Sequence, residues 1–270
     1  MTRTDEVTSV ISRDGTPIGF WSSGTGSPLV LVHGTSGDAT RWAPLRPHLE
    51  PHATLYGMDR RGRGSSGDAE TYDIQREFED IAVVVDAVAE RSGTPVNLYG
   101  HSYGALCAIG ASTLTTNINK LVLYEPVVSG EEAASPDLPD KMDQLLAEGK
   151  REAIVEILFR DVLGMDEDEL TAFRSAPSWQ GRIDAAHTVA REFRAEMGGL
   201  FGRLDVESIS APTLLLKGEL SPDWLRADTD RVAARLPDVR VVVLEGQEHV
   251  ADVMAPELFA GYVLTFLSDA

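Results

Sequence analysis

The sequence predicts an α/β fold in which a mostly parallel sheet of eight strands is covered by helices on both faces. Three observations support this prediction. Most of the predicted strands are continuous apolar runs, as expected for strands that are buried on both sides. Segments with helical periodicity alternate with these runs. The alternation is interrupted once, by a long segment without a strand pattern.

The chain begins with two short strand-like runs, at residues 7–12 and 17–22, which are joined by a turn at Asp14-Gly15 and predict an antiparallel hairpin. The further predicted strands are residues 29–32, 54–58, 96–99, 121–124, 213–216 and 239–244. The helices predicted between and after them are residues 74–89, 103–114, 228–236 and 256–267.

The interruption extends from residue 127 to residue 206. Its helical patterns lie at residues 141–148, 151–163, 167–173 and 182–198. We therefore predict two parts: residues 1–126 and 207–270 form the sheet domain, and residues 127–206 form a helical lid, or cap, inserted into it.

Residues 100–104 read Gly-His-Ser-Tyr-Gly and lie between a predicted strand and a predicted helix. This is the context in which Gly-x-Ser-x-Gly forms a sharp turn that lifts the serine oxygen above the sheet. The glycines are required because the backbones approach closely there. Ser102 is therefore the candidate nucleophile, and His101 is expected to point away from it.

With this motif and this order of elements, the chain resembles the α/β-hydrolase superfamily over essentially its whole length, in particular its cap-bearing serine hydrolases of esterase or lactonase type. The resemblance implies an α/β-hydrolase fold: an eight-stranded, mostly parallel sheet with an antiparallel N-terminal hairpin, helices on both faces, and a helical lid inserted after strand 6. It also implies a catalytic triad and an oxyanion hole.

The family places the catalytic histidine in the loop after the last strand, and here that loop contains His249. A serine hydroxyl needs such a base because it is a poor nucleophile at neutral pH. By the same resemblance, the backbone N–H groups of Tyr103 and Thr35 form the oxyanion hole. Thr35 directly follows a His-Gly pair at the end of the strand at residues 29–32.

The sequence departs from the commonest family pattern at the triad acid, because Ser221 occupies the position where many relatives carry aspartate. Glu125 is the favoured acid, since it ends the sixth predicted strand and its longer side chain reaches toward a neighbouring strand. Asp223 is the alternative acid. Glu219, or a site without an acid, also remains open.

The predicted function is hydrolysis of an ester or lactone of a small hydrophobic molecule, through a Ser-His-Glu triad and an acyl-enzyme intermediate. The alternatives are a carbon–carbon bond hydrolase with the same triad and a ligand-binding protein on this fold. Trp179 and His187 are the candidate substrate-binding residues of the lid, and Phe193 and Met197 add apolar surface to it.

The composition restricts the possible partners. The 24 Lys and Arg against 43 Asp and Glu give a net charge of −19, which disfavours nucleic acids and anionic membranes. We expect a small-molecule substrate as the partner, and the oligomeric state is left open. No apolar leader and no apolar stretch of membrane-spanning length is visible, so a cytoplasmic protein is expected.

No cofactor or metal is expected. The glycine-rich residues 62–67 match a dinucleotide-binding fingerprint, but no helix opens inside them and the segment at residues 74–89 is helical where a second strand is required. No cysteine and histidine cluster has the spacing of a metal site.

Overall fold

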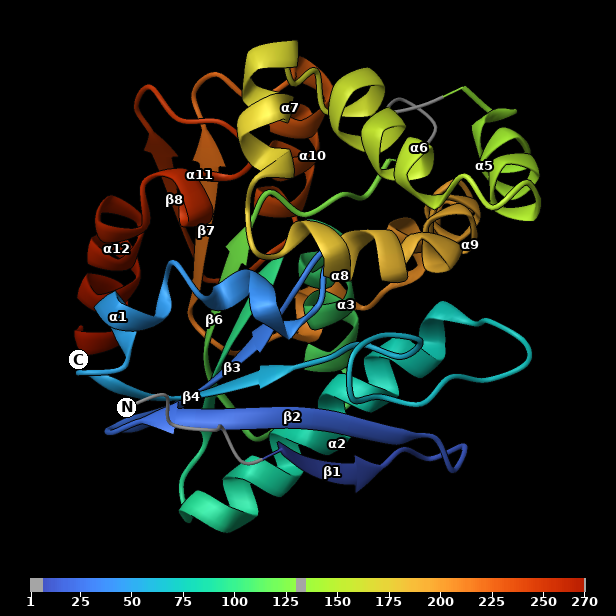
Figure 1. Cartoon of the computed structure of the whole chain (residues 1–270). Coiled ribbons are helices and arrows are strands. Elements are labelled where there is room, and N and C mark those ends of the chain that lie inside the picture. Colours follow the sequence, from blue (N-terminus) through green and yellow to red (C-terminus); the bar gives the residue numbers. More distant parts are fainter. Residues whose placement is uncertain (1–6, 130–134, 270) are drawn as a thin grey trace, which may run out of the picture.

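The computed structural model describes residues 7–129 and 135–269, and within them eight strands form one sheet (Figure 1). The strands are β1 (Val7–Ile11), β2 (Pro17–Gly24), β3 (Ser27–Val32), β4 (Ala53–Met58), β5 (Val96–His101), β6 (Ile118–Tyr124), β7 (Thr213–Gly218) and β8 (Val239–Leu244). Their spatial order is β1-β2-β4-β3-β5-β6-β7-β8. β2 pairs antiparallel with β1 and with β4, and the remaining pairs are parallel. The predicted fold class, with its N-terminal hairpin, is confirmed.

Helices cover both faces of the sheet, and each face has its own hydrophobic core. On one face lie α2 (Ile74–Ser92), α3 (Tyr103–Ser112) and α10 (Asp223–Ala233). On the other lie η1 (Ala39–Trp42), α1 (Arg46–Leu49), α11 (Ala251–Met254) and α12 (Pro256–Ser268). Among the described residues, no helix is both long enough and apolar enough to cross a membrane.

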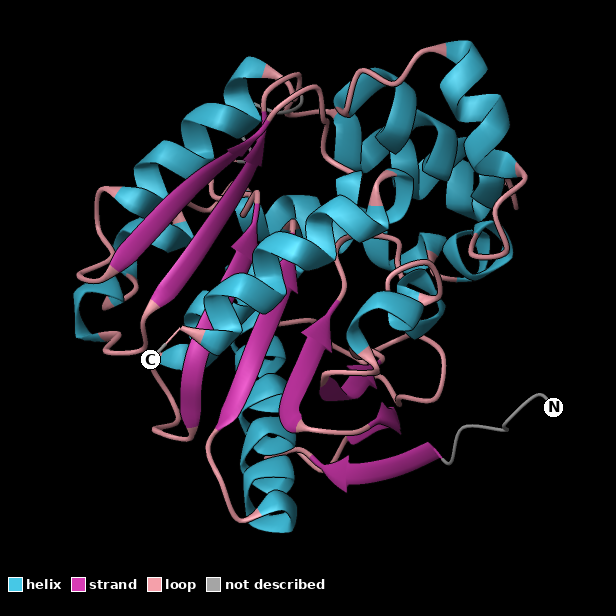
Figure 2. Cartoon of the chain, turned by 90° about the vertical axis from the view of Figure 1, so that its left-hand side faces the viewer, coloured by secondary structure: helices cyan, strands magenta, loops and turns pink. Residues whose placement is uncertain are grey.

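The segment between β6 and β7 contains only helices in its described residues. They are α5 (Leu138–Ala147), α6 (Arg151–Glu156), η2 (Ile157–Val162), α7 (Glu167–Arg174), α8 (Trp179–Asp184), η3 (Ala186–Thr188), α9 (Val189–Glu196), η4 (Leu200–Arg203) and η5 (Val206–Ser208). We call the helices α5 to α9 the cap, and they share a third hydrophobic core. Figure 2 shows them beyond the carboxyl ends of the parallel strands, toward which the arrowheads point.

The cap differs from the sequence prediction in three details. The helix expected at residues 182–198 is divided among α8, η3 and α9, and at the division the Thr188 hydroxyl donates to the Ala185 carbonyl. The helix expected at residues 151–163 continues from Ile157 as a π-helix. The short helices η4 and η5 belong to the core of the sheet domain, since Phe201 and Val206 pack there.

A buried cluster of charge joins the cap to the sheet domain. Arg60 and Arg63 follow β4, and both donate to the carboxylate of Glu192 on α9. Arg60 also pairs with Glu77 on α2, at 3.0 Å. All four side chains are buried, so the helix α9 is attached to the sheet domain by ion pairs that water does not screen.

Candidate active site

Ser102 lies at the sharp turn between β5 and α3, with φ of 58° and ψ of −125°. Non-glycine residues rarely adopt a positive φ, and such a conformation costs on the order of 1–3 kcal/mol. The flanking glycines make the turn possible: a Cβ at Gly100 would lie 2.7 Å from the Ala105 Cα, and one at Gly104 would lie 2.4 Å from the His33 carbonyl oxygen. The serine is therefore held at the carboxyl edge of the sheet.

His249 and Glu125 meet beside this turn. The His249 Nδ1 donates to the Glu125 Oε2 at 2.7 Å, and the other carboxylate oxygen accepts from the Gly218 N–H at 2.7 Å. Glu125 is fully buried and its φ is 44°. These contacts fix the carboxylate at the end of β6, fix the imidazole ring, and leave Nε2 as the free nitrogen of His249.

The other candidate acids lie elsewhere. Asp223 begins α10, its side chain is 93% exposed, and it pairs with Arg226. Glu219 accepts from the Gly246 N–H at 2.8 Å and is exposed. The helix α10 begins at Asp223, directly after Pro222 and five residues earlier than the sequence pattern predicts, so Asp223 lies in its first turn. The structure thus brings Glu125, and neither of the other two carboxylates, to His249.

The backbone N–H groups of Thr35 and Tyr103 donate to no other residue in the described part of the chain. Thr35 lies in the loop after β3, and Tyr103 is the first residue of α3. His33 fixes this loop: its Nδ1 donates to the Gly34 carbonyl, and its Nε2 accepts from the Arg60 N–H at 3.1 Å. Burial and the nearby charge of Arg60 hold the pKa of His33 well below its usual value, so the ring is neutral, as this pattern requires.

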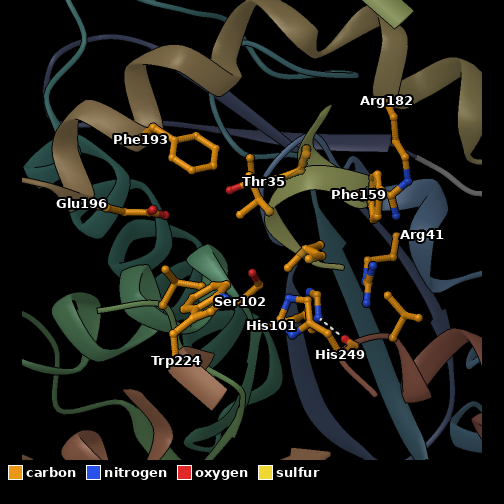
Figure 3. A pocket seen from close by; sticks show the side chains of 15 residues that line it. Thr35, Arg41, His101, Ser102, Phe159, Arg182, Phe193, Glu196, Trp224 and His249 are labelled. Carbon is orange, nitrogen blue, oxygen red and sulfur yellow. Dashed lines mark hydrogen bonds between the residues drawn. The ribbon is translucent and has the colours of Figure 1, made fainter. Parts of the chain in front are cut away.

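Ser102 and His249 line a pocket between the sheet edge and the cap (Figure 3). Its wall is mostly apolar, and its side chains come from the loops around the sheet, from the π-helix η2 and from α8, α9 and α10. The lining residues are Thr35, Arg41, His101, Ser102, Val127, Leu158, Phe159, Val162, Leu163, Arg182, Phe193, Glu196, Trp224, His249 and Val250. An apolar wall with a few polar groups is typical of a small-molecule site.

The two lid residues predicted to bind substrate, Trp179 and His187, are not among the residues that line this pocket. Trp179 packs in the core of the cap, where its Nε1 donates to Glu152 at 2.9 Å. His187 is half-buried, with its Nδ1 3.3 Å from the Arg151 Nη2. Of the larger apolar lid residues, Phe193 does line the pocket.

Several lining residues were missed by sequence analysis. His101, which was expected to point away, lines the pocket and lies against His249 with 4.5 Å between ring centroids. Its Nε2 donates to the His249 carbonyl at 2.9 Å. Arg182 and Glu196 are charged residues on helices of the cap, and both are buried. Position in an amphipathic helix gives no signal for them, because a charged residue there is usually on the solvated face.

Comparison with known proteins assigns the chain to a family. The model of the alpha/beta hydrolase family matches residues 29–261. A solved alpha/beta hydrolase from Sphaerobacter thermophilus is 36% identical, with a TM-score of 0.82 over 97% of this chain and 100% of that chain.

Two curated relatives carry specific names. The (E)-2-((N-methylformamido)methylene)succinate hydrolase of Acinetobacter baylyi is 26% identical over 88% of this chain and 89% of its own. A pimeloyl-[acyl-carrier protein] methyl ester esterase of Xanthomonas campestris is 26% identical over 84% of this chain and 89% of its own. Both names describe hydrolysis. With the family model matched over most of its length and a solved relative that is 36% identical, this chain belongs to the α/β hydrolase family.

Proposed function

We propose that this protein is a serine hydrolase that cleaves an ester or lactone of a small molecule, with Ser102 as nucleophile, His249 as general base and Glu125 as the orienting acid. The observation that carries the proposal is the 2.7 Å hydrogen bond from His249 Nδ1 to a fully buried carboxylate, beside a strained serine in the same pocket. A buried carboxylate stabilises the imidazolium that forms when His249 accepts a proton.

The reaction proceeds in two halves. Ser102 Oγ attacks the carbonyl carbon as His249 Nε2 takes its proton, and the N–H groups of Thr35 and Tyr103 bind the negative oxygen. The proton then passes from His249 to the leaving alkoxide, which remains attached to the acyl group when the substrate is a lactone. Water, activated by His249, releases the acyl group from Ser102 and restores the enzyme.

Two features favour an oxygen ester over other carbonyl derivatives. Backbone donors at the oxyanion position and a single histidine suffice for an alkoxide leaving group. The Xanthomonas campestris relative is named as a methyl ester esterase. The pocket wall contains eight apolar side chains among its fifteen lining residues, so the body of the substrate is apolar.

A fluorophosphonate probe tests the nucleophile. We expect covalent labelling of the peptide that contains Ser102 and hydrolysis of a simple aryl ester, and we expect both to be lost in Ser102→Ala. A folded wild-type protein that is neither labelled nor active would contradict the proposal. Turnover of a vinylogous diketone without any ester hydrolysis would assign carbon–carbon cleavage instead.

The acid is tested by a pair of matched variants. Glu125→Gln keeps the size of the side chain but removes its charge and permits the wrong tautomer of His249, so kcat is expected to fall roughly 10³- to 10⁴-fold. Asp223→Asn, at an exposed residue outside the pocket, is expected to keep the wild-type rate. The reverse result, a large loss in Asp223→Asn and a small one in Glu125→Gln, would exclude Glu125 as the acid.

A further inference from the structure

Arg182 is a buried cation on the cap helix α8 that lines the pocket of Ser102 and His249 (Figure 3). Its exposed fraction is 2%. Its Nη1 donates to the Ser36 Oγ at 3.3 Å, while its Nε and Nη2 have no hydrogen-bond acceptor among the described residues. Two of the three nitrogens of a buried guanidinium therefore have N–H groups without a protein acceptor, in a residue that lines the catalytic pocket.

The neighbouring charges do not neutralise Arg182. Arg41 lines the same pocket, and its Nη2 pairs with Asp252 at 2.5 Å. Asp252 also accepts from the Tyr99 hydroxyl, so its oxygens are already occupied. Asp38, the other acidic residue with an electrostatic effect on Arg182, holds the start of η1 through Thr40. In the described part of the chain, no carboxylate lies within 4.0 Å of Arg182.

The aromatic rings around Arg182 compensate only part of the free-energy cost of burying its charge. The guanidinium carbon of Arg182 lies 5.0 Å from the ring centroid of Phe159 and 4.9 Å from that of Phe173. Such contacts are weaker than a charge-assisted hydrogen bond. Burial, followed by repulsion from Arg41, lowers the pKa of Arg182 to about 9, which still leaves the side chain positively charged at neutral pH.

The free atoms define the shape of the missing partner. Nε and Nη2 form one edge of the guanidinium plane, and this edge donates two parallel hydrogen bonds to the two oxygens of a carboxylate. One uncompensated positive charge matches one carboxylate, whereas a phosphate carries up to two negative charges. Ser36, which holds the third nitrogen, is fully buried and has a strained φ of 57°.

The helix α8, which carries Arg182, packs close to the sheet domain. A Cβ at Gly181 would lie 2.1 Å from the Asp38 Oδ2, so α8 lies close to the loop after β3 and a larger residue there would displace the Asp38 carboxylate. Glu196 lies across the pocket (Figure 3). Burial, with the charges of Glu192 and Asp228, raises the pKa of Glu196 well above its usual value, which favours its uncharged form.

We propose that Arg182 binds a carboxylate of the substrate, so that the ester or lactone cleaved at Ser102 belongs to an acid such as the half-ester of a dicarboxylic acid. This inference rests on the proposed function for the identity of the cleaved bond. The binding of the carboxylate is independent of the proposed function, because it depends on Arg182 and Ser36. The substrate has an apolar middle part, a scissile carbonyl at Ser102 and an anionic end at Arg182.

The test compares two series of 4-nitrophenyl esters. One series contains the half-esters of dicarboxylic acids with two to six methylene groups, and the other contains the monoacid esters of the same chain length. We expect the wild type to prefer at least one half-ester. In Arg182→Met, kcat/KM for that half-ester is expected to fall roughly 10- to 100-fold, the usual effect of losing a charge-assisted pair, with the monoacid ester changed little. For Arg182→Lys, kcat/KM for that half-ester is expected to lie between the values of the wild type and of Arg182→Met.

Arg160→Met is the matched control, because Arg160 is an exposed arginine of the cap that pairs with Asp161 at the surface. It is expected to change neither series. The inference is overturned when the wild type prefers no half-ester over its matched monoacid ester, or when Arg182→Met lowers both series equally.

Two further measurements separate this inference from the proposed function. Should Arg182→Met fail to fold, inhibition of the wild type decides: glutarate is expected to inhibit at least roughly tenfold more strongly than glutaramide, and equal inhibition overturns the inference. Should the wild type be neither labelled by fluorophosphonate nor active, the proposed function fails. Calorimetric binding of glutarate that is lost in Arg182→Met would then still support the carboxylate site, and no binding to the wild type would overturn it.

Discussion

Two clusters of buried charge lie between the cap and the sheet domain, and they differ in balance. In the first, Arg60 and Arg63 share Glu192, and Glu77 supplies a second carboxylate to Arg60. In the second, Arg41 and Arg182 lie near a single buried acid, which Arg41 occupies.

Whether a buried charge has a partner within the protein indicates its role. The cluster around Glu192 has two positive and two negative groups, and it attaches α9 to the sheet domain. In the second cluster Arg41 has an ion-pair partner, whereas Arg182, which borders the pocket, has none within 4.0 Å in the described part of the chain. Burying an uncompensated charge is costly, so a protein retains it where a ligand supplies the counter-charge. The balanced cluster is thus structural, and the unbalanced one is a binding site.

The largest effect is expected from breaking the balanced cluster. Glu192→Gln leaves Arg60 and Arg63 with a neutral partner, and removing one member of a buried ion pair costs about 3–5 kcal/mol. The free energy of unfolding, measured in urea, should fall by that amount at pH 7. The exposed pair of Glu207 and Arg235, 2.8 Å apart, is the control, and Glu207→Gln is expected to have little effect because solvent screens it.

The same substitution has a defined pH dependence. Burial alone would raise the pKa of Glu192, but Arg60 and Arg63 outweigh it and lower the pKa. A carboxyl with a depressed pKa in the folded state contributes stability above its unfolded pKa, and this stability is lost as the pH falls through the folded pKa. The difference between the wild type and Glu192→Gln should therefore be largest near neutral pH and decrease in acid. A difference that does not depend on pH would show that packing, rather than charge, makes Glu192 necessary.

A smaller effect of opposite sign is expected at the unbalanced cluster. Arg182→Met removes a buried charge that lacks a partner, and the free protein should become more stable by about 1 kcal/mol or more, since leaving a buried donor unsatisfied costs about 1–3 kcal/mol. Arg41→Met is the paired comparison: it leaves Asp252 without its cation and should destabilise the protein. Two substitutions of the same type on one pocket would then shift the midpoint of thermal unfolding in opposite directions. Equal destabilisation would mean that Arg182 is a structural residue like Arg41.

The sequence predicted the fold of the sheet domain, and it proposed a site there, but it gave no signal for the charges of the cap. Ser102 and His249 are recognisable because a strand, a glycine-bounded turn and a loop place them in a fixed order. Glu125 could be selected because it ends a strand beside that loop. Such positions follow from the connectivity of a parallel sheet, whose carboxyl ends meet at one edge.

The lining residues of the cap depend on information that local patterns lack. Arg182 is recognisable as a binding residue only when the structure shows which of its N–H groups lack an acceptor. That depends on Asp252, which already pairs with Arg41, and on Ser36, and both residues are more than sixty residues away in the chain. Trp179 was predicted to contact substrate from its residue type and its place in the lid, yet it packs in the core of the cap. Tertiary packing decides which residues of the cap line the pocket, and the helical pattern of the sequence carries no information about that packing.

The smallest effect sharpens the comparison within a single helix. Glu192 and Glu196 lie one turn apart on α9 and both are buried, yet only Glu192 has arginine partners. Burial first, then repulsion from Glu192 and Asp228, raises the pKa of Glu196. In the unfolded chain this carboxyl ionises near pH 4.5, whereas in the folded protein it stays protonated to a higher pH, so stability decreases as the pH rises between the two values.

Glu196→Gln removes that ionisation while keeping the size and polarity of the side chain. The variant should match the wild type near pH 4 and be more stable than the wild type at pH 8, by about 1.4 kcal/mol for each pKa unit of the shift that lies below pH 8. The measurement is urea unfolding of both proteins at the two pH values. Because Glu192→Gln is expected to lose stability where Glu196→Gln gains it, a loss of stability in both variants at pH 8 would mean that Glu196 is ionised and has a cationic partner, and the pocket would then repel a substrate carboxylate.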